Sequence, residues 1–107
     1  MGPVSEDPFA AVLARIAGEA RQTNLRRADH LEEALSRLSE GRLDEEGRQR
    51  AVRAAHQLAG SAGTFGHQRA GELARRIEQF LAAPQQPTTV AEALAVVAEC
   101  RSELAQG

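Results

Sequence analysis

The chain has 107 residues, which is enough for one compact domain with a hydrophobic core, and its single cysteine, Cys100, excludes an intramolecular disulfide. Hydrophobic residues make up 42% of the sequence and aromatic residues only 3%, a composition typical of a helical bundle. The net charge of −2 and the lack of a long apolar run argue against binding to nucleic acid or membranes, so we expect one soluble, cytoplasmic domain over residues 1–107.

Two helices are predicted in the first part of the chain. The first is short and begins with Asp7 as N-cap and Pro8 in the first turn. A polar break at residues 22–24 separates it from the second helix, which ends at Gly41. The apolar residues of the first helix recur at helical spacing: Phe9, Val12, Leu13, Ile16 and Ala20.

The third helix is expected to begin after Asp44, a favourable N-cap, and to run to about Thr64. Gly66 is well placed to stop it in a left-handed conformation, so a tight connection to the next helix follows. Its core face is predicted to consist of Ala51, Ala55, Leu58, Ala62 and Phe65.

Two more helices complete the chain. The fourth has an apolar face, and Pro84 and Pro87 prevent its continuation. The fifth opens with a capping box between Thr89 and Glu92. The apolar face of the fourth is formed by Ala70, Leu73, Ile77, Phe80 and Leu81. Because no segment alternates as a strand does, the prediction is an all-α fold, an antiparallel bundle of helices around one core.

His56 is the candidate functional residue, because residues with almost no side chain follow it on its own side of the helix. Gly60 and Gly63 each weaken a helix by about 1 kcal/mol relative to alanine, so stability alone does not explain them. Their helical angles place them outside the core stripe, beside an imidazole at the boundary with solvent. A second protein could therefore approach the ring closely.

The other polar groups are predicted to have ordinary surface roles. His30 and His67 lie off the apolar faces, and three histidines and one cysteine without ligand-like spacing do not predict a metal site. Four residues of the fourth helix are expected to form a solvated, ion-paired face that could also contact a partner: Glu72, Arg75, Arg76 and Glu78. Ser61 is expected to bond a carbonyl within its own helix.

The run His56-Gln57-Leu58-Ala59-Gly60-Ser61-Ala62, with Phe65-Gly66 after it, resembles the H-x-L-K-G-S-A pattern of histidine-containing phosphotransfer (HPt) domains. The resemblance implies an antiparallel four-helix bundle with a short additional N-terminal helix and with His56 on the surface of a central hairpin. His56 would accept a phosphoryl group from a receiver-domain aspartyl phosphate, or from a sensor or hybrid histidine kinase, and relay it to a response-regulator aspartate. The chain would be a carrier more than an enzyme, with no cofactor of its own and Mg²⁺ only on the receiver domain. A monomer is expected, because the apolar stripes can all be buried inside one bundle.

The chain departs from the family pattern at Ala59, where lysine is usual, so a cation beside the phosphoryl group is not assured. Arg53, one turn before His56, could partly substitute, and Gln49 or Gln57 could donate hydrogen bonds to phosphoryl oxygens. With Gly60 and Gly63, these residues form the predicted phosphoryl environment or docking surface. The departure is expected to affect phosphohistidine lifetime or partner preference.

Two other classes of function remain open. A helical adaptor, or a degenerate domain that docks receiver domains without phosphotransfer, would not need a bare surface around one histidine. A hydrolase or transferase acting on a small molecule is disfavoured, because the bundle has little room for a pocket and no paired acid and base is expected beside His56. Loss of function on removing the imidazole alone would separate the carrier from the adaptor.

Overall fold

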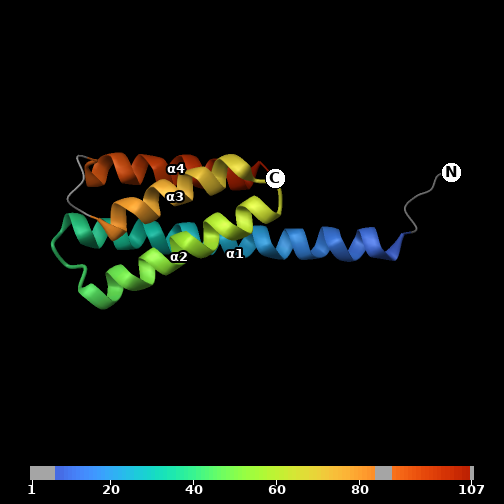
Figure 1. Cartoon of the computed structure of the whole chain (residues 1–107), viewed down its shortest axis with the longest axis horizontal. Coiled ribbons are helices and arrows are strands. Elements are labelled where there is room, and N and C mark those ends of the chain that lie inside the picture. Colours follow the sequence, from blue (N-terminus) through green and yellow to red (C-terminus); the bar gives the residue numbers. More distant parts are fainter. Residues whose placement is uncertain (1–6, 84–87, 107) are drawn as a thin grey trace.

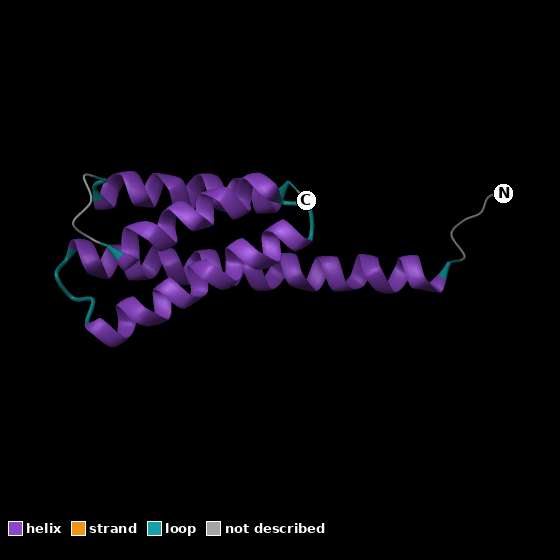
Figure 2. Cartoon of the chain, viewed as in Figure 1, coloured by secondary structure: helices purple, strands orange, loops and turns teal. Residues whose placement is uncertain are grey.

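A computed structural model describes residues 7–83 and 88–106 of the chain. Within these ranges it contains four helices and no strand (Figure 2): α1 (Pro8–Ser39), α2 (Glu45–Thr64), α3 (Gln68–Ala82) and α4 (Val90–Ala105). Each helix packs against two others, α1 and α3 both lying against α2 and α4, and successive helices run in opposite directions (Figure 1). The all-α prediction is confirmed, and the arrangement is that of an antiparallel four-helix bundle.

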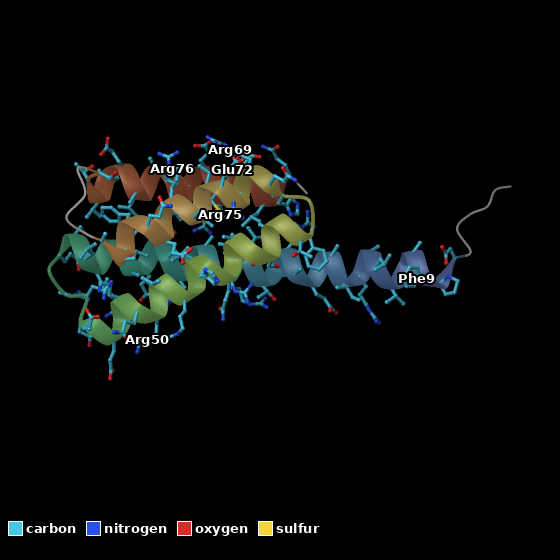
Figure 3. All side chains as sticks on the ribbon, viewed as in Figure 1. Phe9, Arg50, Arg69, Glu72, Arg75 and Arg76 are labelled. Carbon is cyan, nitrogen blue, oxygen red and sulfur yellow. The ribbon has the colours of Figure 1, made fainter. Side chains whose placement is uncertain are left out.

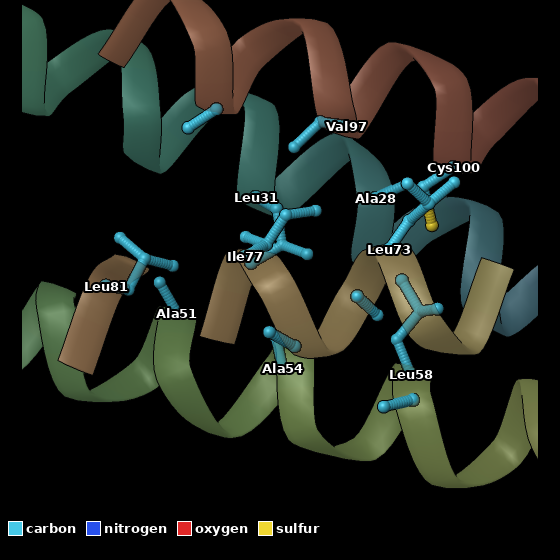
Figure 4. Packing of buried hydrophobic residues seen from close by; sticks show 14 of the residues in the cluster. Ala28, Leu31, Ala51, Ala54, Leu58, Leu73, Ile77, Leu81, Val97 and Cys100 are labelled. Carbon is cyan, nitrogen blue, oxygen red and sulfur yellow. The ribbon is translucent and has the colours of Figure 1, made fainter. Parts of the chain in front are cut away.

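One hydrophobic core joins all four helices (Figure 4). Its large side chains include Leu31 of α1, Leu58 of α2, Leu73 and Ile77 of α3 and Val97 of α4, each at most 1% exposed. Many of the remaining core residues are alanines, which allow helix axes to approach closely. The apolar face predicted for the fourth helix is confirmed on α3, since all five of its residues are buried.

The predicted break at residues 22–24, and with it the separate short N-terminal helix, is wrong: α1 is one continuous helix of 32 residues. None of residues 22–24 is glycine or proline, so nothing in the backbone forces an end. Asn24 is 1% exposed and donates from Nδ2 to the Ser61 hydroxyl at 3.0 Å, while its Oδ1 accepts from Arg27 at 2.8 Å. These bonds take up an amide that would otherwise compete with the helix backbone.

The N-terminal part of α1 extends past the end of the bundle (Figure 1). Its apolar stripe is consequently exposed: Phe9 68%, Leu13 49%, Val12 41% and Ile16 41%. The monomer was expected because every apolar stripe could be buried inside one bundle, and this stripe is not. The structure therefore removes that argument for a monomer.

The predicted helix ends are largely confirmed. The Asp44 carboxylate accepts from the Gly47 amide at 2.7 Å, and Thr89 forms both bonds of the capping box with Glu92. Gly41 and Gly66 have φ angles of 70° and 87°, the left-handed conformation expected after α1 and α2. The end of α3 is at Ala82, whereas the prolines at 84 and 87 lie outside the described residues. None of the four described helices has both the length and the apolarity needed to cross a membrane.

Candidate functional site

The imidazole of His56 stands on the outer surface of α2, and its side chain is 76% exposed. The neighbouring core stripe fixes the orientation of the helix, because Ala51, Ala55, Leu58 and Ala62 are all fully buried. Phe65, predicted as the last residue of this stripe, is instead 36% exposed, because α2 ends at Thr64 and Phe65 is its C-cap. The position of His56 at the edge of the buried face agrees with the helical angles.

Glu78 of α3 lies beside the histidine, a contact that the sequence did not predict. Its Oε2 is 3.1 Å from Nδ1 of His56. An ionised carboxylate can only accept a hydrogen bond, so in the neutral imidazole the proton lies on Nδ1 and the lone pair on Nε2. Glu78 is thus one acidic group beside His56, and a side chain exposed to this extent does not lie in a deep cleft.

The surface that follows His56 on α2 is bare. A Cβ added at Gly60 or Gly63 would meet no atom within 4 Å, so both glycines face open space. Ala59 is 3% exposed and turns its methyl group towards the core. The next side chain on this side of α2 is that of Thr64, whose hydroxyl donates to the Gly60 carbonyl oxygen at 3.0 Å.

The other predicted site residues on α2 are exposed, but the structure does not bring all of them to the imidazole. Gln49 donates from Nε2 to Oε2 of Glu45 at 3.0 Å, in the first turn of the helix. Hydrogen bonds from Arg48 and then Gln49 lower the pKa of Glu45 to about 2. Arg53 and Gln57 flank His56 on the exposed side of the helix.

Close packing fixes the α2–α3 hairpin next to the bare surface. A Cβ added at Gly71 of α3 would lie 3.2 Å from the carbonyl oxygen of Ala59 and 3.6 Å from the nitrogen of Gly63. On the other side of α2, the Ser61 hydroxyl accepts the bond from Asn24 of α1, so the expected bond within its own helix is replaced by one between helices. These contacts hold α2 against both of its neighbours.

The ion-paired face expected on α3 is found only in part. Oε1 of Glu72 lies 3.8 Å from Nη1 of Arg69, and Glu78 pairs with His56. Neither Arg75 nor Arg76 forms an ion pair with another residue in the part of the chain that the structure describes. Two arginines on α3 are thus left without a carboxylate partner there.

The remaining histidines have no site around them. His30 is exposed on α1, and His67 is the N-cap residue of α3 without a side-chain capping bond. A search of residues 7–83 and 88–106 finds no group of three or more histidine, cysteine or acidic side chains able to hold a metal ion. The candidate site therefore consists of His56, Glu78 and the surface around them.

The family model described as the Hpt domain matches the chain over residues 14–107. The match includes all of α2, α3 and α4 and begins within α1, so the exposed Phe9, Val12 and Leu13 lie outside it. No curated protein and no solved structure matches the chain.

Proposed function

The chain belongs to the Hpt domain family, and on this basis we propose that His56 is the residue that carries the phosphoryl group. Membership implies histidine phosphotransfer in phosphorelays of two-component signalling, where Hpt domains typically interact with receiver domains and histidine kinases. The observation that carries the proposal is the pairing of an exposed imidazole with Glu78 through Nδ1. This pairing directs the nucleophilic lone pair of Nε2 to the outside, where a partner can reach it.

The proposed transfer is a displacement at phosphorus. The Nε2 lone pair attacks the phosphorus of an aspartyl phosphate, the N–P bond forms, and the P–O bond to the aspartate breaks with release of its carboxylate. The imidazole ring becomes positively charged and keeps its proton on Nδ1, next to the Glu78 carboxylate. No proton has to leave for the step to balance, and transfer to the next aspartate is the same step in reverse.

In-line attack needs the receiver domain to approach the ring closely, and the bare surface supports such an approach. Gly60 and Gly63 project no side chain there, and Gln57 and Arg53 are exposed on the same helix on either side of His56. The proposed direction is from a receiver-domain aspartyl phosphate, or a kinase, through His56 to a response-regulator aspartate. Residues 1–107 act in this proposal as one carrier domain.

The test is phosphorylation with phosphoramidate and with a phosphorylated receiver domain, followed by intact mass and phosphorus NMR. We expect one acid-labile, base-stable phosphoryl group, which His56→Gln abolishes. His30→Gln is the matched control, since His30 is also an exposed helical histidine. A folded wild type that binds receiver domains but takes up no phosphoryl group would instead support the docking-only adaptor.

A further inference from the structure

Phosphorylation of His56 would place like charges together. A phosphoryl group carries a charge of about −1.5 to −2 near neutral pH, and the carboxylate of Glu78 already lies 3.1 Å from the same ring. On α2, the residues that follow His56 on its side are Ala59, Gly60 and Gly63, none of which carries charge. A cation that offsets this repulsion has to come from elsewhere on the surface.

The geometry of α3 places Arg75 at the edge of the bare surface. Gly71, Arg75 and Glu78 are spaced by four and three residues, so they share one stripe of the helix. Gly71 lies against the α2 backbone at Ala59, and Glu78 contacts His56. Arg75 lies between these two contacts on α3, and it shares a hollow with Gly63 of α2.

The side chain of Arg75 is available for a ligand. It is exposed and lines a hollow with Gly63 and Gly71, to which Glu72 also contributes, and no ion pair joins it to another residue in the described ranges. Figure 3 labels Arg75 and Glu72 on α3. Arg53 and Arg76 are also without an ion pair in these ranges, so what distinguishes Arg75 is its place next to the bare surface.

We propose that Arg75 binds the phosphoryl oxygens of phosphorylated His56 from across the hairpin. This inference rests on the proposed function. A guanidinium offers a planar pair of N–H donors that match two phosphoryl oxygens, and its charge offsets that of Glu78. Arg53 is the other nearby cation, but it precedes His56 on α2, whereas Arg75 lies on α3 one turn before Glu78, the residue that contacts the imidazole.

The experiment compares Arg75→Ala with Arg76→Ala. Arg76 is the adjacent residue of the same type, but it lines a hollow with Phe80 and Val96 on the side of α4. Each variant is loaded with phosphoramidate, and the phosphorus chemical shift is followed against pH. The midpoint of this titration reports the charge around the phosphoryl group directly, whereas a merely structural role would leave it unchanged.

We expect Arg75→Ala to raise the midpoint by about half a pH unit or more, because loss of a nearby cation disfavours the dianion. Arg75→Lys should stay close to the wild type. Arg76→Ala should behave as the wild type.

Equal midpoints in Arg75→Ala and Arg76→Ala would overturn the assignment to Arg75, as would a rise in Arg53→Ala alone. In both cases His56 would still be the carrier. A wild type without any phosphoryl group on His56 would overturn the proposed function, and this inference with it.

Discussion

Nδ1 of His56 lies 3.1 Å from Oε2 of Glu78, although 22 residues separate them in the chain. In the neutral imidazole this bond places the proton on Nδ1 and the lone pair on Nε2, so in the proposed transfer Glu78 positions the imidazole without touching the phosphorus. We expect Glu78→Ala to lower the fraction of the Nδ1–H tautomer and to slow phosphorylation of Nε2 by roughly 10-fold. Nitrogen NMR of the imidazole measures the tautomer directly.

Glu78→Gln is the matched control, because its amide oxygen can still accept from Nδ1. It should retain most of the tautomer preference while removing the negative charge. If Glu78→Ala leaves the tautomer populations as they are in the wild type, the hydrogen bond does not control the reactive nitrogen.

Gly60 and Gly71 lie on facing helices, and the same substitution should affect them oppositely. Gly60→Ala meets no atom within 4 Å and improves helix propensity, so stability should rise by up to about 1 kcal/mol. Gly71→Ala brings a Cβ to 3.2 Å from the carbonyl of Ala59, and separating the helices should cost about 1–3 kcal/mol. Urea unfolding followed by circular dichroism measures both, and a stabilised Gly71→Ala would contradict the close packing.

A large residue in place of Gly60 tests the docking of a receiver domain separately from the phosphorylation of His56. Gly60→Leu has room in the isolated chain, so phosphoryl loading from phosphoramidate should stay within about twofold of the wild type. The same variant should lose at least 10-fold in transfer to a receiver domain, because the side chain holds the partner away from Nε2. Equal losses with both donors would mean that Gly60 serves the histidine itself and not the docking of a partner.

The sequence was informative where signals are local. Asp44, Gly66 and Thr89 each act within one turn of the helix end that they mark, so these ends could be predicted. The contact of Glu78 with His56 could not, because it depends on the register between α2 and α3 that Gly71 helps to set. The prediction of a break near Asn24 was wrong for a similar reason, because the Asn24 amide donates a hydrogen bond to the hydroxyl of Ser61, which lies 37 residues away in the chain.

The burial of Cys100 in the core can be tested without involving His56. Burial raises the pKa of its thiol to about 11, and Sγ lies 3.5 Å from the Ala70 carbonyl oxygen. At pH 8 we expect iodoacetamide to alkylate the folded chain roughly 100-fold more slowly than the chain in urea. Between about pH 9 and 11 the unfolded thiol loses its proton before the folded one, so stability should fall as pH rises, and Cys100→Ser should lack this slope.

Phe9 and Leu31 lie on the same helix, one beyond the bundle and one inside its core. Leu31→Ala should lower the free energy of unfolding by about 2–5 kcal/mol, because Leu31 is fully buried. Phe9→Ser should change it by less than about 0.5 kcal/mol, because Phe9 is 68% exposed. Denaturation at several protein concentrations measures both effects. A loss of more than 1 kcal/mol in Phe9→Ser that grows with protein concentration would mean that the exposed stripe of α1 is covered by another copy in solution.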